Sequence, residues 1–290
     1  MPKDKYTATW VSHTSLSDYI KCPRAYFLKN VYKDPQTGHK IQIMSPSLAL
    51  GSAVHEVVEN LSVIPTDERF SQSLVLRLES IWDRYTGKKG GFTNTDQEFY
   101  FKERGKAMLR RVMDYPGPLA NKAVKINQDL PSYWISETDN IILCGKIDWL
   151  EYFPETDSVH IIDFKTSRKE EESESLQLPI YVLLVNNCQK RKVDKASYWY
   201  LELNEEPSEK ELPDTIKAEA EILNIARQIK LARKLEKFDC PEDRSGCVHC
   251  RSMEKILKGE GTLVDSNSQR DIYILPRNEV VEEETDSIIL

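Results

Sequence analysis

Two aspartates and a lysine in the middle of the chain have the residue types and spacing of a metal-dependent hydrolytic site. Asp148 closes the segment GKID (145–148), and both Asp163 and Lys165 lie in IIDFKTS (161–167). Carboxylate oxygens are ligands for hard divalent cations. A cation and an ammonium held together can stabilise the charge of a phosphodiester under attack. Asp-x-Lys alone is common on solvated strands, but an unpaired Asp163 in an apolar run would be costly.

Apolar runs predict the strands that position these side chains. Residues 141–144 lead into GKID and residues 159–162 lead into IIDFKTS, whereas residues 152–158 are turn-forming. We expect a β-hairpin that brings Asp148 and Asp163 side by side. Because side chains two apart on a strand share a face, Lys165 is expected beside Asp163.

Length and composition fit a soluble globular protein with a full core. The 290 residues are 40% hydrophobic and 30% charged, enough for one large domain or a domain with an insertion. No apolar run approaches about eighteen residues and the N-terminus lacks an apolar signal core. We therefore expect a cytoplasmic protein without membrane association.

Charge alone does not assign a nucleic-acid surface. The formal charge of −7 argues against nonspecific coating of nucleic acid, although the local field in a cleft matters more than the sum. Basic clusters lie at 102–111 and 190–192. Each fits a solvated helix face slightly better than a DNA contact.

Helices are expected on both sides of the strand region. The pattern predicts helices over 14–30 and from about 48, a mostly helical stretch over 66–130, and helices over about 175–188 and 207–237. Breaks are expected at 87–91 and 116–118. Further strands are expected near 133–137, 196–203 and 271–275.

Five short segments and three late cysteines stand in an order that resembles one superfamily. They are SLSDYIKCPRAYFL (15–28), GSAVHEVVE (51–59), GKID (145–148), DFKT (163–166), QLPIY (177–181), and Cys240, Cys247 and Cys250. The set resembles the PD-(D/E)XK nuclease superfamily over about residues 15–250. Its nearest likeness is to the RecB/AddB nuclease domains and the CRISPR-associated iron–sulfur exonucleases.

The resemblance implies an α/β fold, with a mixed central β-sheet flanked by helices in a restriction-endonuclease-like core. It also implies a helical insertion and a terminal iron–sulfur staple. We expect the nuclease domain to span residues 1–275, with the insertion at 62–130 and the cysteine segment at 240–250. Residues 276–290 form an acidic tail that is expected to be disordered.

The resemblance also assigns roles to single residues. It implies that Asp148 and Asp163 ligate Mg²⁺ or Mn²⁺, with the backbone carbonyl of Phe164 completing the shell. Lys165 would position or help deprotonate the attacking water and offset negative charge. By itself, His55 fits a core histidine best; in this ordered set it matches the family's metal-binding histidine, which favours Mn²⁺ over Mg²⁺.

Helix spacing adds residues around this set. Glu59 lies one helical turn after His55 and fits a carboxylate behind the ligands or a partly exposed helix charge equally well. Gln177 and Tyr181 match the family's Q-x-x-x-Y helix, which contacts DNA or orients the lysine. Pro179 fits only a first helical turn, so the helix is expected to start near residue 178, with Gln177 at its cap.

The cysteines form a second candidate site. Spacing alone favours a structural zinc ion, whereas the resemblance implies a [4Fe–4S] cluster that ties the first helix to the last segment. Such a staple would be structural, since it closes a very long loop. The expected ligands are Cys22, Cys240, Cys247 and Cys250, whereas Cys144 and Cys188 are expected to be buried thiols.

The function implied by the resemblance is metal-dependent hydrolysis of DNA, as an exonuclease at ends, on single strands. The pathway would be repair and recombination or CRISPR spacer acquisition. No G-x-x-x-x-G-K-[ST] segment occurs, so unwinding would need a helicase or another recombination or CRISPR protein. The alternative is a noncatalytic DNA-binding or scaffold subunit that keeps the fold and cluster. A zinc-stapled RNA-processing protein has no supporting motif.

Overall fold

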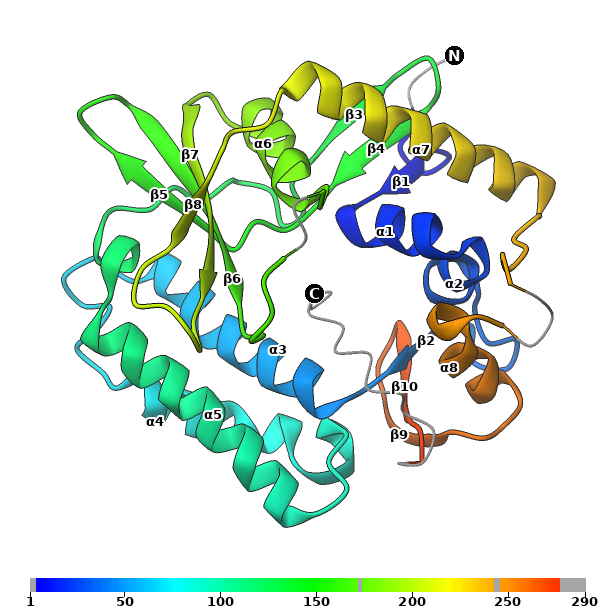
Figure 1. The fold of residues 1–290 in the computed structure, drawn as a ribbon, viewed down its shortest axis with the longest axis horizontal. Helices are drawn as coiled ribbons and strands as arrows, with labels where there is room; N and C mark the ends of the chain where they lie inside the picture. Colours follow the sequence, from blue (N-terminus) through cyan, green and yellow to red (C-terminus); the bar gives the residue numbers. More distant parts are fainter. Residues whose placement is uncertain (1–3, 172–173, 243–245, 277–290) are drawn as a thin grey trace.

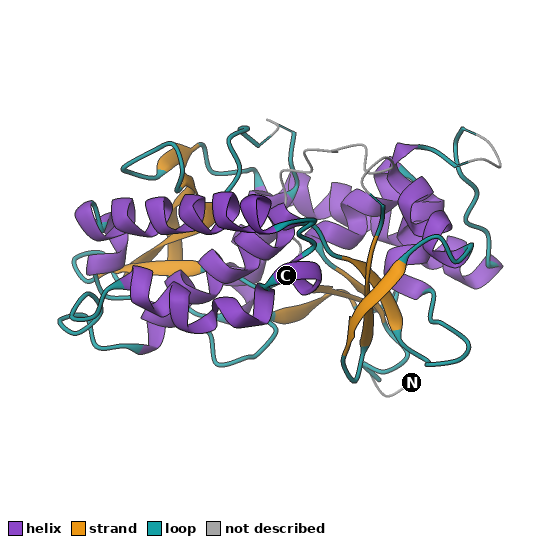
Figure 2. Ribbon diagram, turned by 90° about the horizontal axis from the view of Figure 1, so that it is seen from below, coloured by secondary structure: helices purple, strands orange, loops and turns teal. Residues whose placement is uncertain are grey.

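The computed structural model describes residues 4–171, 174–242 and 246–276, which form an α/β structure (Figures 1 and 2). The α-helices are α1 (His13–Lys21), α2 (Pro23–Tyr26), α3 (Pro46–Glu59), α4 (Leu74–Ile81), α5 (Thr95–Asp114), α6 (Gln177–Cys188), α7 (Thr215–Leu235) and α8 (Val248–Leu257). Single-turn helices are η1 (Phe27–Val31), η2 (Asn60–Val63), η3 (Trp82–Tyr85), η4 (Gly87–Gly90) and η5 (Gly117–Ala120).

The described strands build three sheets. Their bounds are β1 (Thr9–Val11), β2 (Lys40–Ile43), β3 (Ser132–Ser136), β4 (Ile141–Cys144), β5 (Trp149–Phe153), β6 (Ser158–Lys165), β7 (Lys192–Tyr200), β8 (Ser208–Lys210), β9 (Thr262–Ser266) and β10 (Arg270–Ile274). Strand orders are β1-β4-β3, β2-β10-β9 and β5-β6-β7-β8. Each sheet mixes parallel and antiparallel pairs.

The four-stranded sheet is covered on both faces, which determines the character of its central strand. Val159 and Ile161 of β6 pack into a core shared with α6 and α7. Ile162 and Phe164 on the other face pack into a core shared with α3, α4 and α5. Figure 1 shows these two groups of helices on opposite sides of the sheet. Every residue of β6 is buried, including the polar Ser158, His160, Asp163 and Lys165, so the polar side chains of this strand need partners inside the protein.

Polar caps begin the helices that frame the site. Ser12 and Ser15 form a reciprocal capping box at α1, and Ser45 caps α3 with Pro46 in its first turn. Both arrangements satisfy backbone N–H groups that would otherwise lack partners at the helix start. The first turns of α1 and α3 are therefore set by local sequence.

A smaller part of the fold joins the two ends of the described chain. β2 pairs in parallel with β10, and α2 packs against α8. Their shared core includes Leu28, Met253 and Ile256. Asp271 of β10 is buried and accepts hydrogen bonds from Thr37 Oγ1 and Ser266 Oγ, each 2.6 Å away. Residues more than two hundred positions apart thus form one packed unit.

The expected α/β class with mixed strands flanked by helices is confirmed, but the strands form separate sheets. The hairpin exists between β5 and β6. Asp148 precedes its first strand, however, rather than ending a strand that begins at Ile141. β4 ends at Cys144 and pairs with β1 and β3, so the chain changes sheets over residues 145–148.

Two further differences concern the second half of the chain. The expected helix from Pro207 starts only at Thr215, because β8 pairs with β7 first and Asp214 caps the helix. Gln177 is the first residue of α6 and not its cap, and Pro179 falls in the first turn as predicted. None of the helices in the described ranges combines the length and apolar character that a membrane crossing requires. Nearly all of the acidic tail, from residue 277, lies outside the described residues.

Candidate active site

The carboxylate of Asp163 lies buried near the end of β6, with one oxygen in a hydrogen bond and the other in an ion pair. Its Oδ1 accepts a hydrogen bond of 2.8 Å from Gln177 Nε2. Its Oδ2 is buried and has no hydrogen bond in the structure. Lys165 Nζ lies 3.1 Å from Oδ2 as an ion pair. Asp163 Oδ2 is therefore paired with a charge but has no hydrogen-bond donor of its own.

Asp148 reaches the same point from the start of β5. Its Oδ2 accepts a hydrogen bond of 2.9 Å from the backbone N–H of Phe164, the residue between Asp163 and Lys165. Burial raises the pKa of Asp148 to about 7, and the charges of Asp163 and Glu59 add to the shift, although His55 opposes it. The pair of strands thus concentrates negative charge that needs a cationic partner.

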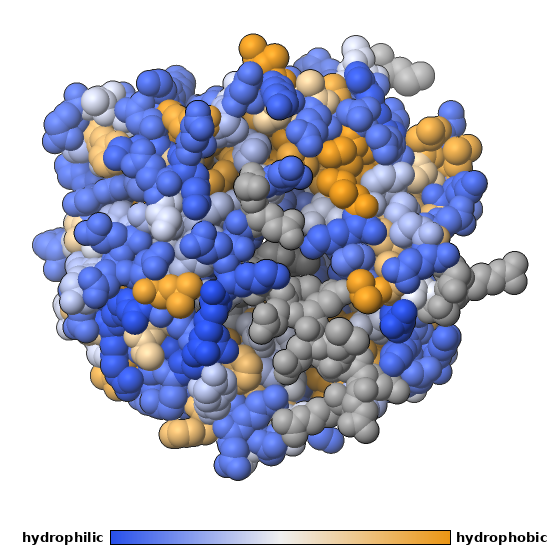
Figure 3. Space-filling view, in the orientation of Figure 1, coloured by the Kyte–Doolittle hydropathy of each residue, from blue (hydrophilic) through white to orange (hydrophobic). Residues whose placement is uncertain are grey.

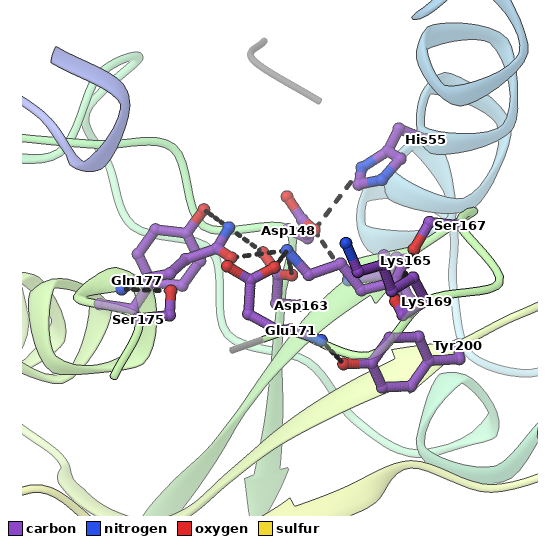
Figure 4. Close-up of polar contacts among 12 residues, drawn as sticks. His55, Asp148, Asp163, Lys165, Ser167, Lys169, Glu171, Ser175, Gln177 and Tyr200 are labelled. Carbon is purple, nitrogen blue, oxygen red and sulfur yellow. Dashed lines mark hydrogen bonds and ion pairs between the residues drawn. The ribbon is translucent and has the colours of Figure 1, made fainter. Parts of the chain in front are cut away.

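His55 extends this group from α3, as Figure 4 shows. Its Nδ1 lies 3.5 Å from Asp148 Oδ2 and 3.2 Å from Glu59 Oε1. Burial opposes protonation, but Asp148 and Glu59 outweigh it and raise the pKa of His55 to about 9. Lys146 Nζ approaches the other Glu59 oxygen at 2.5 Å. Glu59 is therefore mostly buried, faces the same His55 nitrogen as Asp148 and is not an exposed helix charge.

Lys165 is held by three polar partners. Its ammonium donates to Gln177 Oε1 at 2.6 Å and lies 3.1 Å from both Asp163 Oδ2 and Glu171 Oε2. Although burial lowers the pKa of Lys165, Asp163 and Glu171 outweigh it and raise the pKa above its usual value. The side chain is thus buried, charged and fixed in direction (Figure 4).

The first turn of α6 links the two halves of the site. Gln177 contacts Lys165 through its oxygen and Asp163 through its nitrogen, and Nε2 also lies 3.2 Å from Tyr181 Oη. In this orientation the Gln177 amide accepts from the Lys165 ammonium and donates to the Asp163 carboxylate. One glutamine thus fixes the relative placement of these two groups. The i, i+4 spacing of Gln177 and Tyr181 puts both on the face of α6 that meets the sheet.

The structure brings together all seven residues expected at this site: His55, Asp148, Asp163, Phe164, Lys165, Gln177 and Tyr181. It also adds Glu171, which the sequence analysis missed. Glu171 lies in the charged loop after β6, where its backbone N–H donates to Tyr200 Oη at 2.7 Å. No spacing rule connects a loop acid to Lys165, and a run of charged residues such as the one that starts at Arg168 resembles any solvated turn. His13, at the start of α1, was also missed; burial lowers its pKa beside Glu171 and Lys165.

The residues present fit a divalent cation. One ligand atom from each of His55, Glu59 and Asp148 lies within 4.8 Å of the others, and Asp163 Oδ2 is a buried oxygen without a hydrogen bond. Imidazole and carboxylate donors together suit Mn²⁺ and Mg²⁺. A cation bound here would also compensate the buried negative charge.

The four cysteines expected to share a metal are gathered at a second place. The sulfurs of Cys22, Cys240, Cys247 and Cys250 lie within 4.8 Å of one another, with Cys250 Sγ 3.8 Å from Cys240 and 3.9 Å from Cys247. Burial raises the pKa of Cys22 to about 11. Burial acts the same way on Cys240, but backbone N–H groups lower its pKa to about 7.

The sulfur geometry fits a thiolate metal centre that joins the first helices to α8. Four thiolates around one Zn²⁺ at about 2.3 Å lie about 3.8 Å apart, close to the separations seen here. A [4Fe–4S] cluster places iron and sulfide between the thiolates, so binding one requires these sulfurs to lie farther apart. Cys144 is buried and its Sγ contacts Val11 O, and Cys188 is half-buried; neither belongs to this group.

The comparison with known families agrees with this geometry. The model of the PD-(D/E)XK nuclease superfamily matches residues 10–254, which include both the carboxylate site and the four cysteines. No curated protein sequence matches the chain. Because the family model covers most of the chain, the chain belongs to the PD-(D/E)XK nuclease superfamily.

Proposed function

We propose that this member of the PD-(D/E)XK superfamily is a divalent-metal-dependent deoxyribonuclease that degrades DNA from its ends, with single strands as its substrate. The observation that carries the proposal is the convergence of Asp148, Asp163, Lys165 and Gln177 at the end of one strand, with His55 facing them. A noncatalytic scaffold would have no use for a buried lysine held between two carboxylates and an amide.

The proposed cation ligands are His55, Asp148, Asp163 and the carbonyl of Phe164, with the Glu59 carboxylate beside His55 and Asp148. A divalent cation there would polarise the scissile phosphate and lower the pKa of a bound water. Lys165 would place a positive charge beside the phosphate oxygens, where charge grows during attack. Gln177 would hold the Lys165 ammonium in that direction, since the same amide also donates a hydrogen bond to Asp163.

Glu171 gives the substrate-free site a defined starting state. Asp163 and Glu171 both neutralise the Lys165 ammonium, which lies 3.1 Å from each. A phosphate oxygen approaching Lys165 would compete with Glu171, which comes from a loop, more easily than with Asp163, which belongs to β6. Glu171 is thus proposed to position Lys165 until a substrate phosphate takes its place.

The cysteine centre is proposed to be structural. The family order, with one cysteine in the first helices and three near the end, supports a [4Fe–4S] cluster, whereas the sulfur spacing supports one Zn²⁺ ion. In either form the centre would couple α2 to α8 and keep residues 1–275 in one nuclease domain.

The resemblance to RecB/AddB nuclease domains and CRISPR-associated exonucleases suggests a cytoplasmic role in DNA repair and recombination or in spacer acquisition. Any unwinding would come from a partner helicase or another protein of the same pathway.

Incubation with end-labelled DNA tests the proposal. Purified protein should shorten a 5′- or 3′-labelled single strand in Mn²⁺, with Mg²⁺ weaker and EDTA inactive. Products that shorten stepwise from an end would support the exonuclease mode, and discrete internal fragments would argue for endonuclease action. Protein that binds DNA but cuts neither single nor double strands with either metal would favour the scaffold alternative.

A further inference from the structure

Three arginines from two distant segments converge just beyond the end of β7. Arg104 Nη2 and Arg168 Nη2 lie 2.5 Å and 2.6 Å from the carboxylate of Glu202. Arg111 donates instead to the backbone carbonyls of Leu201 and Glu202. Arg104 and Arg111 come from α5, whereas Arg168 follows the catalytic motif.

This cluster carries excess positive charge on a protein whose overall charge is negative. Its three arginines and Glu202 sum to +2, against a formal charge of −7 for the whole chain. The Arg168 side chain is 62% exposed, whereas Glu202 is only 13% exposed. The cation therefore faces solvent and the anion lies beneath it, an arrangement that favours an anionic ligand.

The cluster adjoins the proposed catalytic lysine. The backbone N–H of Leu201 donates to the carbonyl of Lys165 at 2.9 Å, so residues 201–202 continue directly from the catalytic end of the sheet. Figure 1 shows the ends of β6 and β7 directed toward α5. Figure 3 shows the side of the molecule seen in Figure 1, where hydrophilic side chains predominate. The cluster and Lys165 therefore lie at the same end of the sheet.

Aromatic rings stand beside the cations on α5. Tyr100 is 50% exposed and Phe99 66% exposed. The Arg104 guanidinium lies 5.7 Å from the Tyr100 ring centre, and Tyr100 also interacts electrostatically with Arg168. Successive positions of a helix point in different directions, so Tyr100 is the exposed ring that stands beside these cations. It can stack against an unpaired base, as aromatic side chains do in single-strand-binding proteins.

We infer that Tyr100 of α5 and Arg168 belong to a single-stranded DNA track, with a base stacked on Tyr100 and a phosphate held by Arg168. The track leads to Lys165 and Asp163. This inference rests on the proposed function and deepens it, because a duplex keeps its bases stacked inside and cannot use Tyr100. The track thus selects unpaired strands before chemistry occurs.

Binding without cleavage tests the track. A fluorescein-labelled single-stranded oligonucleotide is titrated with the protein in EDTA and followed by anisotropy, beside a duplex of the same sequence. Tyr100→Ala should weaken single-strand binding about tenfold and leave duplex binding within twofold. Arg168→Ala should weaken it and lower the slope of log K against log salt by about one, and Arg168→Lys should restore the slope.

Tyr6→Ala is the matched control. Tyr6 is 88% exposed and also stands beside a cation, Lys5, 5.7 Å from its ring centre. It precedes β1, on the opposite side of the molecule from α5 in Figure 1. Its loss should change nothing, and thermal unfolding should be the same for all variants.

The outcomes separate this inference from the proposed function. Single-strand binding that is absent in the wild type, or unchanged by both Tyr100→Ala and Arg168→Ala, overturns the track even if the protein cuts DNA. A wild type that binds through these residues but never cuts in Mn²⁺ supports the track and overturns the nuclease proposal. If Tyr6→Ala weakens single-strand binding as much as Tyr100→Ala does, the binding is a nonspecific surface contact and the track is overturned.

Discussion

Lys165 illustrates how burial and pairing create chemistry that the residue type alone does not have. A lysine removed from water loses charge unless partners compensate. Here Asp163, Glu171 and Gln177 all contact the ammonium, so the charge survives in a region shielded from water. There it interacts more strongly with a phosphate than a surface lysine would. The contacts that offset the energetic cost of burying the ammonium also fix the direction of the side chain.

Removal of either charge of the Asp163–Lys165 pair should abolish cleavage. We expect Asp163→Ala and Lys165→Ala to lower the cleavage rate by about a hundredfold or more, since such groups contribute several kcal/mol to transition-state stabilisation. Initial rates on single-stranded DNA in Mn²⁺ measure the effect. Asp157→Asn is the control, because Asp157 lies in the solvent-exposed turn of the same hairpin. Asp163→Ala protein that keeps more than a few per cent of wild-type activity would show that the site is assigned wrongly.

His55→Ala should impair metal use more than folding. His55 adds a nitrogen donor to carboxylate donors, so its loss should raise the Mn²⁺ concentration needed for half-maximal activity, with partial recovery at high Mn²⁺. The measurement is activity across a Mn²⁺ titration, with circular dichroism as the check on folding. Glu59→Gln should shift the same curve less, because glutamine keeps an oxygen donor beside His55 and leaves the proposed ligands in place. An unchanged titration for His55→Ala would make it a core histidine.

At the residue scale, sequence reasoning found the groups that a short motif contains and missed those that a loop supplies. Asp163, Lys165 and Gln177 stand in segments with a period of two or four, so their neighbours follow from strand or helix geometry. Glu171 reaches Lys165 only because its loop folds back onto Tyr200. The path of such a loop depends on tertiary contacts that no local pattern encodes.

The helices around the cysteines should depend on their metal. Protein purified without oxygen should be brown, with a broad absorbance near about 400 nm that dithionite bleaches, as thiolate-bound iron–sulfur centres are. Colourless protein with one zinc ion per chain would show that the cysteines hold Zn²⁺, which the sulfur spacing favours, and not an iron–sulfur cluster.

Cys22→Ser should release the metal as completely as Cys250→Ser and should lower the melting temperature, since the centre joins α2 to α8. Metal analysis and thermal unfolding measure both effects. Cys188→Ser should do neither, because Cys188 lies at the end of α6 outside the cysteine group. Loss of metal from Cys188→Ser but not from Cys22→Ser would contradict the ligand set.

The β2–β10–β9 sheet should lose stability in acid through Asp271. Hydrogen bonds from Ser266 and Thr37 lower the pKa of Asp271 to about 2, below its ordinary value of 3.8. Its contribution is therefore complete above about pH 4 and is lost as the pH falls toward 2. Asp271→Asn should lower the free energy of unfolding by about 1–3 kcal/mol near pH 6, and its difference from wild type should shrink across that window.

Urea unfolding at several pH values measures this difference. Asp265→Asn is the control on the same sheet, because Asp265 is 43% exposed, lies 3.6 Å from Lys89 and accepts a hydrogen bond from the neighbouring backbone N–H of Ser266, which asparagine can also accept. A wild-type advantage that stays constant from pH 6 to about pH 2 would exclude Asp271 as the titrating group.

At the element scale, periodicity predicted the long helices better than the short strands. The apolar positions of α3 and α6 repeat over several turns, so their existence could be inferred. β1, β8 and β9 have three to five residues and are strands only because a partner strand lies beside them. The charged run after Pro207 has helical spacing, but β8 pairs with β7 there and delays the helix to Thr215.

At the scale of the whole molecule, pairings between distant segments determine the architecture. β1 lies beside β4 and β2 beside β10, both in parallel, and Cys22 meets three cysteines from beyond α7. Each pairing closes a loop of more than a hundred residues, which costs entropy in proportion to the logarithm of its length. Sequence patterns suggested that such a link exists through the cysteines but gave no sign of the parallel strands beside it.

The acidic tail should be dispensable for chemistry. Leu275 is the last buried residue of the described chain and packs beside Met253 and Ile256, so truncation after Leu275 leaves that core complete. The removed segment carries Glu282, Glu283, Glu284 and Asp286, which would repel a phosphate backbone near the cleft.

We therefore expect the truncated protein to cut single-stranded DNA at least as fast as the full chain. Any gain should be largest at low salt, where repulsion between charges is least screened. Cleavage rates at low and high salt, with metal content and melting temperature, measure the outcome. A truncated protein that folds and keeps its metal but fails to cut DNA would place the tail within the active enzyme. Because the tail's charges would oppose those of the arginine cluster, a gain confined to low salt would indicate that both act on the same approaching strand.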